Sequence, residues 1–293
     1  MKTDQIDDSS APLIEHLAEL RNRLIWSVLA FLVAMLLCFA VAEPILDFLL
    51  TPIEEAMRAL GNPNPTMQYT APQEYFFTMV HISVVAGLML SFPVIGYQLW
   101  RFIAPGLYRS EKQAFLPFLI ASPVLFLCGA AFAHYVVTPI AMQFFLGFAD
   151  SSSLLTALLP GLKDAPVSEI TQPETAKGID IVFQGKVNET LDISLKLILA
   201  FGFCFQLPVL LTLMGKAGLV TSRGLGGMRK YAIVLILLLA AFLTPPDVLS
   251  QMILFLAVYP LYEVSIIMIR RIEKKREAEA RADGTWVDED EEK

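Results

Sequence analysis

The chain has 293 residues, of which 55% are apolar and 17% are charged, and its mean hydropathy is +0.58. An ordinary soluble domain carries about 25% charged residues, so this composition excludes a disordered chain and argues against a soluble enzyme. The formal net charge of −7 leaves no basic surplus, which argues against a nucleic-acid partner.

Six apolar runs predict an all-α integral membrane protein with six transmembrane helices. An amphipathic lead-in over 12–24 precedes the first run, which has 19 uncharged residues and crosses roughly 30 Å at 1.5 Å per residue. The fifth run has only about 13 residues, or roughly 20 Å, so we expect a short fifth helix beside a tilted sixth. The predicted spans are 24–42, 75–99, 115–137, 193–214, 231–243 and 248–269.

Lysine and arginine are distributed unevenly between the two sets of loops. The two termini and the two loops on their side carry 17 of the 22 bases, whereas the opposite loops carry four. The positive-inside rule therefore places the N- and C-termini in the cytoplasm. We expect a membrane domain over 1–272 and a charged cytoplasmic tail over 273–293 that is helical at first and then disordered. In the first external loop, apolar residues at helical spacing over 44–60 predict an interfacial cap.

The common catalytic and metal-binding motifs are absent from the sequence. There is no GxxxxGK[ST] loop, no HExxH and no CxxC, and no Ser, His and Asp set has suggestive spacing. We therefore expect neither an enzyme nor a bound cofactor or metal. His81 and His134 fall within predicted spans, where a buried, hydrogen-bonded histidine is commoner than a proton relay.

Four polar or aromatic groupings remain, and each has a structural as well as a functional interpretation. In the lead-in, Glu19 and Arg23 have i,i+4 spacing and would form a weak helix pair. The loop over 100–112 is aromatic enough for an apolar shelf or for ordinary interface anchors. The external hinge over 243–251 contains two prolines, and Asp247 there can cap the sixth helix. At membrane depth lie three polar side chains that hydrogen bonds between helices would explain: Gln206, Gln251 and Glu263.

These groupings resemble the TatC family of the twin-arginine, Sec-independent protein translocase over nearly the whole chain. The resemblance rests on HLAELRNRL at 16–24, on FP at 92–93 through FIAPGLY at 102–108 to Glu111, on FGF at 201–203 through QLPV at 206–209, and on LTPPDVLSQ at 243–251. It implies a receptor in the bacterial cytoplasmic membrane for folded cargo, and transport driven by the proton-motive force. Implied partners are twin-arginine signal peptides, the single-span TatA and TatB proteins, membrane lipid, and further copies of the chain in a TatBC receptor complex.

The resemblance also assigns roles to individual residues. Binding of the signal peptide falls to Glu19, Glu111, Phe102 and Arg21, and docking of TatA and TatB to Thr244, Gln251 and Gln206. Structural roles in the hinge and in the first external loop fall to Pro52, Asp247, Pro245 and Pro246. Gln206 departs from those family members that have a membrane-embedded glutamate, so we expect it to form hydrogen bonds rather than carry protons.

Elementary energetics agree with a receptor. A guanidinium presents a rigid donor fork to a carboxylate, which lysine does not, so two acids can select Arg-Arg over Lys-Lys. Two shielded, charge-assisted hydrogen bonds, at about 1.5–3 kcal/mol each, would raise the affinity for an Arg-Arg peptide by a factor of roughly 10² to 10⁴. That is too little to move a folded domain, so the driving force must be external. The alternatives are a small-solute or ion transporter that uses Gln206, Gln251 and Glu263, and a scaffold for other membrane proteins.

Overall fold

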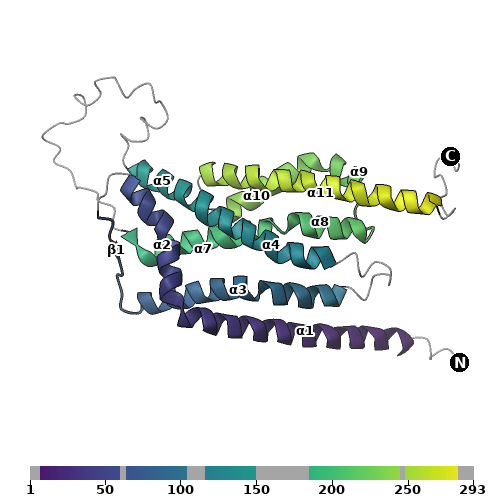
Figure 1. Ribbon diagram of the computed structural model, residues 1–293, viewed down its shortest axis with the longest axis horizontal. Helices are drawn as coiled ribbons and strands as arrows, with labels where there is room; N and C mark the ends of the chain where they lie inside the picture. The colour runs from purple at the N-terminus through teal and green to yellow at the C-terminus, as the bar shows by residue number, and fades with distance from the viewer. Residues whose placement is uncertain (1–6, 60–63, 104–115, 150–184, 245–247, 283–293) are drawn as a thin grey trace, which may run out of the picture.

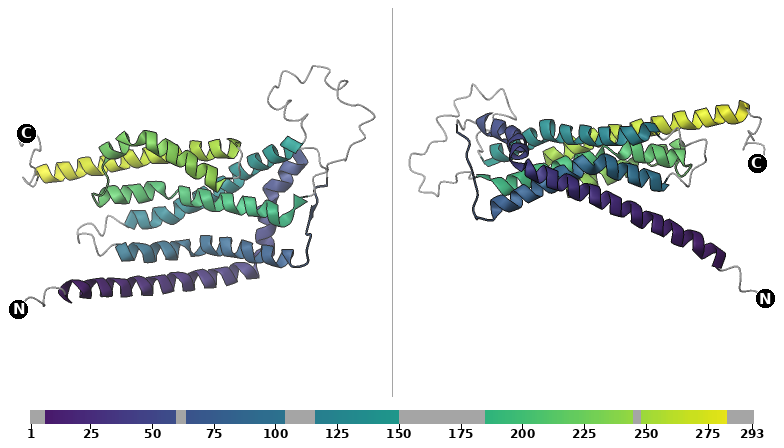
Figure 2. Two further views of the ribbon diagram at one scale, coloured as in Figure 1. Left: turned by 180° about the vertical axis from the view of Figure 1, so that it is seen from behind. Right: turned by 60° about the horizontal axis from the view of Figure 1, so that its bottom comes forward.

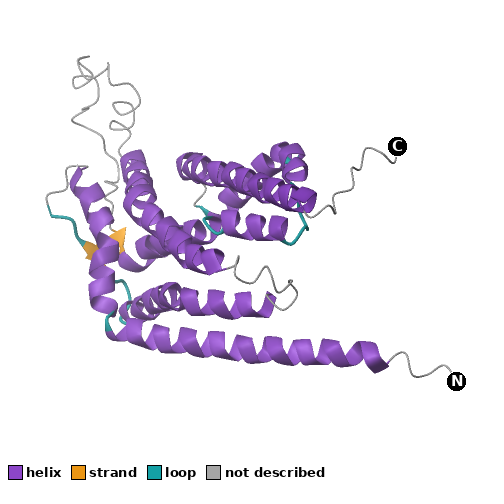
Figure 3. Cartoon of the chain, turned by 45° about the vertical axis from the view of Figure 1, so that its right-hand side comes forward, coloured by secondary structure: helices purple, strands orange, loops and turns teal. Residues whose placement is uncertain are grey.

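The computed structural model describes residues 7–59, 64–103, 116–149, 185–244 and 248–282. The long helices run side by side, and the start of α1 and the end of α11 lie at the same end of the bundle (Figure 1). Two short strands pair in parallel at the opposite end, close to α2 (Figure 3). The elements are α1 (Asp7–Ala40), α2 (Ala42–Ala59), β1 (Met67–Gln68), α3 (Glu74–Ile103), α4 (Leu116–Phe132), the π-helical turn η3 (Ala133–Val137), α5 (Thr138–Ala149), β2 (Gly185–Lys186), α7 (Val187–Cys204), α8 (Leu207–Lys216), α9 (Ser222–Gly227), α10 (Arg229–Leu243) and α11 (Val248–Ala282).

The all-helical membrane architecture predicted from the apolar runs is confirmed. Within the described ranges, five segments are long and apolar enough to cross a bilayer: Leu17–Ala40, Pro72–Leu99, Phe118–Leu146, Val187–Lys216 and Ser250–Glu279. The remaining predicted span corresponds to α10, whose 15 residues measure about 22 Å. The fifth helix is therefore short, as the sequence indicates.

The lead-in and the first span form one continuous helix, α1. It packs along α3, and its N-terminal half diverges from the other helices (Figure 2). The two backbones approach so closely at Gly87 that a Cβ there would lie 2.7 Å from Met35 Cα. Small residues allow such approaches in membrane helices. The opposite face of α1 exposes large apolar side chains, among them Leu24, Leu29 and Leu36, as expected for a face in contact with lipid.

Helix α2 crosses the end of the bundle opposite the start of α1 (Figure 1). Its inward face buries Leu46, Leu49, Ile53 and Met57, which recur at helical spacing. The outward face carries exposed charges, including the Glu54–Arg58 pair. The amphipathic pattern over 44–60 thus produces a cap over the bundle.

Two of the predicted spans are irregular. The third continues from α4 through the π-helical turn η3 into α5, and the fourth breaks between α7 and α8 at Phe205 and Gln206. The break lies just before Pro208, which has no N–H to donate to the carbonyl of Cys204. In addition, α11 continues beyond the predicted membrane domain to Ala282, and Glu273 on this extension accepts a hydrogen bond of 2.8 Å from the Ser222 N–H at the start of α9.

The core lies where α4, α7 and α11 pack against their neighbours. Its largest fully buried side chains include Phe126, Phe201, Leu254 and Ile266. A Cβ on Gly129 would lie 2.5 Å from the Phe201 carbonyl oxygen, so α4 and α7 touch almost backbone to backbone. These contacts hold the central helices together while α1 remains attached mainly through α3.

Candidate functional site

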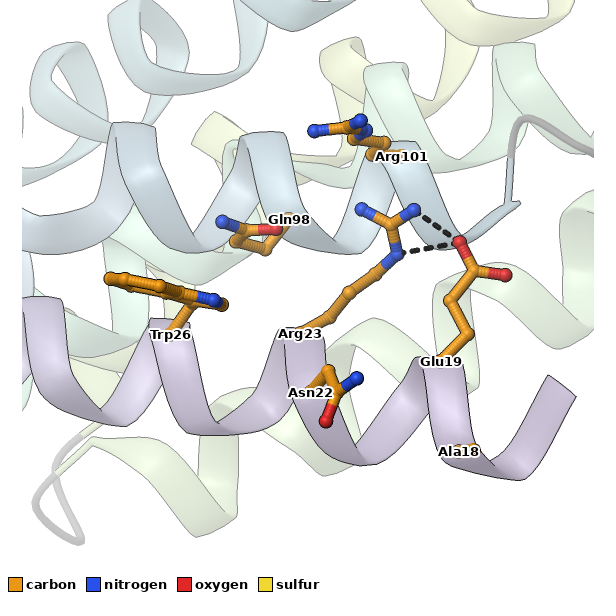
Figure 4. Close-up of a pocket in the computed structure, with 7 residues that line it drawn as sticks. All are labelled: Ala18, Glu19, Asn22, Arg23, Trp26, Gln98 and Arg101. Atoms are coloured by element: carbon orange, nitrogen blue, oxygen red, sulfur yellow. Dashed lines mark hydrogen bonds and ion pairs between the residues drawn. The ribbon is translucent and has the colours of Figure 1, made fainter. Parts of the chain in front are cut away.

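An open cleft of about 650 Å³ separates α1 from α3 at the end of the bundle where α1 begins. Figure 4 shows the side chains that line it, and they come only from these two helices. Helix α1 contributes five residues, four of which lie at i, i+3, i+4 and i+7, and α3 contributes two residues from its last two turns. The lining residues are Ala18, Glu19, Asn22, Arg23, Trp26, Gln98 and Arg101.

The carboxylate of Glu19 holds a guanidinium within this cleft. Arg23 Nε donates to Glu19 Oε1 at 3.0 Å, and Arg23 Nη2 donates to the same oxygen. The Arg23 side chain is 15% exposed and that of Glu19 is 34% exposed. The i,i+4 pair predicted from the sequence is therefore formed, at a position partly sheltered from water.

The cleft combines charge with flat side chains. Arg101 faces the Glu19–Arg23 pair from α3, while Trp26 and Gln98 lie further along the cleft (Figure 4). Indole faces and carboxylates are the groups that bind arginine side chains in proteins. The described lining holds two arginines against one carboxylate, so a cationic ligand needs further negative charge from outside this set.

The structure places only some of the predicted signal-binding residues. Phe102 is half-buried at the end of α3, directly after Arg101 of the cleft. Arg21 is exposed, and its Nη2 donates to Asn22 Oδ1 at 3.4 Å. Glu111 lies outside the described residues, as do Pro245, Pro246 and Asp247 of the hinge. Pro52 is buried within α2.

Gln206 is bound to its own chain. Its Nε2 donates to the Ser122 carbonyl at 2.7 Å, and Ser122 Oγ donates to its Oε1 at 2.8 Å. Both residues line an apolar cavity of about 410 Å³ between α3, α4 and α8. The predicted hydrogen-bonding role is thus fulfilled between α4 and the break before α8.

Two of the other three predicted polar positions join α10 to α11. Thr244 is buried at the end of α10, and its Oγ1 donates to the Ala240 carbonyl of the same helix at 2.9 Å. Gln251 Nε2 of α11 donates to the Leu237 carbonyl of α10 at 3.1 Å. Glu263 accepts two bonds from Arg229, from Nε to Oε1 at 2.8 Å and from Nη2 to Oε2 at 2.9 Å.

A family model described as Sec-independent protein translocase protein (TatC) matches residues 15–256. The chain belongs to the TatC family. It is 43% identical to the TatC protein of Magnetococcus marinus over 281 residues, which cover 96% of this chain and 92% of that relative. It is 35% identical to the TatC protein of Aquifex aeolicus over 265 residues, covering 90% and 97%. A crystal structure of a twin-arginine translocase receptor, TatC, superposes with a TM-score of 0.67 at 34% identity, covering 87% of this chain and 98% of that one.

Membership of the TatC family decides the class of protein. This chain is the TatC receptor component of the twin-arginine translocase, a multi-pass membrane protein and not an enzyme. The small-solute transporter considered from the sequence is set aside by this result.

Sequence reasoning did not find Gln98, Arg101 and Trp26 as parts of the TatC cleft, nor Ser122 as the partner of Gln206. The spacing of Gln98 and Arg101 predicts that they share one face of a helix. It does not predict which other helix that face contacts. Serine 122 lies 84 residues from Gln206, and nothing in the pattern of either run pairs them.

Proposed function

We propose that the cleft between α1 and α3 binds the twin-arginine motif of signal peptides on the cytoplasmic side of the bacterial inner membrane. Glu19 and Glu111 would accept the two guanidinium groups, with Phe102 as an apolar wall and Arg21 at the rim. The observation that carries the proposal is the Glu19–Arg23 pair, in which two N–H donors of one guanidinium meet the carboxylate within the cleft. A site that holds one arginine in this way has the shape and chemistry to hold another.

An incoming arginine can bind Glu19 beside Arg23. A carboxylate can accept about four hydrogen bonds, and Arg23 donates two, both to Oε1. A charge-assisted bond in a shielded site contributes about 1.5–3 kcal/mol, so binding beside Arg23 favours the peptide without breaking the existing pair.

The excess of positive charge in the cleft means that a second carboxylate is needed to bind two arginines. Arg23 and Arg101 outnumber Glu19 among the described lining residues. Two peptide arginines would add further positive charge, which repels at this range. Glu111, eight residues after the last residue of α3, is the acid that the family resemblance assigns to this role.

We also propose that TatA and TatB dock against the short α10 and the adjoining part of α11, near Thr244 and Gln251. About 22 Å of helix leaves α10 short of roughly 30 Å of hydrocarbon, and a single-span partner packed alongside would cover the mismatch. Gln206, in its apolar cavity, is the third docking position. Transport itself would draw on the proton-motive force.

The test is photocrosslinking from position 102 to an Arg-Arg signal peptide and to its Lys-Lys counterpart, with the full chain in membranes. We expect Glu19→Gln and Glu111→Gln each to weaken crosslinking of the Arg-Arg peptide and to leave membrane insertion intact. The matched control is Glu54→Gln, because Glu54 forms the same i,i+4 pair with Arg58 on α2, at the other end of the bundle. Undiminished crosslinking by the Glu19→Gln, Glu111→Gln double variant would remove the proposed site.

A further inference from the structure

The short helix α10 begins well inside the end of the bundle that carries both termini, which the loop charges predict to be cytoplasmic. Arg229, the first residue of α10, pairs with Glu263 of α11, and its Nε lies 2.8 Å from Oε1. Glu263 precedes Arg270 by seven positions, which is about 10 Å along a helix. Measured along α11, the start of α10 therefore lies well short of Arg270.

Helix α9 lies alongside α11 over this stretch (Figure 1). Tyr262 Oη donates to the Leu225 carbonyl at 2.8 Å, and the Ser222 N–H donates to Glu273 Oε1 at 2.8 Å. These two bonds hold α9 against α11, and α10 follows α9 directly. The basic side chains that these three helices carry here therefore belong to one packed unit.

Exposed side chains on and next to α9 are apolar as well as basic. Leu219 is 74% exposed and Met228 is 55% exposed, while Arg223 and Lys230 are exposed bases of the same segment. Large apolar side chains beside lysine and arginine are typical of segments that lie in the membrane interface. The composition therefore favours a position of α9 at the level of the lipid headgroups.

Two further bases flank the Arg229–Glu263 pair. Lys230 follows Arg229 on α10, and Arg270 lies within electrostatic range of the Glu263 carboxylate. Side chains on a helix lean toward its N-terminus, so Arg270 points back along α11 toward this level. Neither Lys230 nor Arg270 forms an ion pair of its own among the described residues. Three bases against one acid leave a formal net charge of +2 at this position.

An apolar face of α10 continues from these bases into the membrane. Four side chains at helical spacing are exposed: Tyr231 at 61%, Val234 at 65%, Leu235 at 55% and Leu238 at 66%. Lys230 Nζ lies 5.1 Å from the centroid of the Tyr231 ring, so its charge lies beside the first residue of this face. Bases followed by a lipid-exposed apolar face match the order of phosphate and acyl chain in a phospholipid.

Charge and apolar surface together select the occupant. A zwitterionic headgroup brings a cation that these bases repel, whereas an anionic phospholipid brings only negative charge. The segment 283–293 of this chain, with six acids and one base, has a suitable sign as well. The face from Tyr231 to Leu238 extends about 10 Å, and covering it would carry those acids into hydrocarbon, which is costly. An anionic phospholipid fits both the charge and the apolar face.

We propose that Lys230 and Arg270 bind the phosphate of an anionic phospholipid of the cytoplasmic leaflet, whose acyl chains cover the exposed face of α10. The bound headgroup lies beside the start of α10 and accommodates the short length of this helix. Thr244, near which we propose that TatA and TatB dock, follows the opposite end of α10. The lipid site is therefore separate from partner docking and from the cleft that contains Glu19.

The first experiment labels the full chain in phosphatidylcholine nanodiscs with photoreactive lipids that carry a diazirine next to the headgroup. One probe is a phosphatidylglycerol and the other is a phosphatidylcholine, in equal amounts. Each base near the membrane surface favours an anionic lipid by about fivefold. We therefore expect phosphatidylglycerol to label 223–235 and 264–275 about five- to thirtyfold more strongly. Equal labelling of these segments by the two probes would overturn the proposal.

Matched variants test the two bases. Lys230→Gln and Arg270→Gln each remove one charge and leave the Arg229–Glu263 pair, so each should lower the phosphatidylglycerol labelling about fivefold. The control is Arg281→Gln, because Arg281 is an exposed residue of the same helix about 16 Å beyond Arg270, outside the headgroup layer. Preferential labelling that survives in the Lys230→Gln, Arg270→Gln double variant would refute the role of these bases.

A last comparison separates the lipid from other anions. Soluble glycerol phosphate has the charge of the headgroup without acyl chains, so we expect no competition with the phosphatidylglycerol probe at equal concentration. Effective competition would reveal a site for a free anion instead of a lipid. Changing the acids at 288–292 to their amides should leave the labelling unchanged. A severalfold rise would mean that segment 283–293 occupies the site in the unaltered chain, which contradicts the proposal.

Discussion

Gln206 and Ser122 exchange two hydrogen bonds, of 2.7 and 2.8 Å, between the break before α8 and the middle of α4. The Gln206 amide is both donor and acceptor: its Nε2 donates to the Ser122 backbone carbonyl, and its Oε1 accepts from the Ser122 hydroxyl. The amide is therefore bound within its own chain while it lines an apolar cavity. A glutamate at position 206 would introduce a charge, whereas the Gln206 amide is neutral and links the break before α8 to α4. The cavity near Gln206 is accordingly a packing surface with a polar contact at its wall.

We predict that the Gln206–Ser122 pair is energetically coupled. Gln206→Leu removes both bonds, and Ser122→Ala removes one while the Ser122 carbonyl remains available. Hydrogen bonds between membrane helices average about 0.6 kcal/mol, so we expect a coupling of about 0.5–1.5 kcal/mol in a double-mutant cycle of unfolding free energies in detergent. Ser91→Ala is the control, since its Oγ bonds to Leu88 within α3. Additive effects of the two changes would show that the pair is not a unit.

The ion pair between Arg229 and Glu263 fixes α10 to α11. We predict that Glu263→Gln lowers the unfolding free energy, and because the Arg229 side chain is 48% exposed, solvent screening limits the loss to about 0.5–1 kcal/mol. The loss should shrink in about 1 M salt, where the Debye length is near 3 Å. The control is Lys275→Gln, because Lys275 pairs with Glu279 on the same helix at 3.7 Å, with side chains that are 78% and 63% exposed. A loss that does not depend on salt would exclude an ionic origin.

The sequence predicts the helices of this protein better than the contacts between them. Long uncharged runs identify the spans because only a helix satisfies its backbone in lipid. The amphipathic spacing around Leu49 and Ile53 likewise predicts the cap. The period of a run does not say which helix its faces meet, and so neither the partner of Gln206 nor the α3 wall of the cleft was predictable.

The two irregularities within the spans, the break before Pro208 and the π-helical turn at His134, differ in whether the sequence marks their position. The predicted span 193–214 is continuous, so the break between α7 and α8 was not predicted, although the missing N–H of Pro208 marks its position in the sequence. The π-helical turn at His134 has no such marker, since one extra residue in a turn is stabilised by packing against α2 and α7 rather than by local sequence. The sequence therefore placed His134 in a span, but the hydrogen bond expected there is not formed at Nδ1, which is buried without a partner among the described residues.

Removing a positive charge from the cleft should strengthen peptide binding. Arg101 lines the cleft opposite Glu19, where it repels an arginine-rich ligand. Two like charges roughly 4–8 Å apart in water repel each other by about 0.5–1 kcal/mol, so we expect Arg101→Gln to raise the affinity for the Arg-Arg peptide about two- to fivefold at low salt. Fluorescence polarisation with the labelled peptide measures this. The control is Arg58→Gln on α2, and weaker binding by Arg101→Gln would mean that Arg101 contacts the peptide favourably.

The close approach of α1 and α3 provides the last prediction. A Cβ at position 87 would lie 2.7 Å from Met35 Cα and 2.8 Å from Met35 N, so Gly87→Ala must push the two helices apart. Backbone atoms cannot move aside as a flexible side chain can, and we expect a loss of about 1–3 kcal/mol in unfolding free energy. Because the cleft is formed by these same helices, the variant should also reduce crosslinking of the signal peptide.

Gly96→Ala on the same helix is the matched control, since a Cβ there meets nothing within 4 Å. This variant should leave the unfolding free energy unchanged or slightly raise it. If both variants have equal stability in detergent and equal crosslinking in membranes, the packing of α1 on α3 at Gly87 does not hold the cleft together.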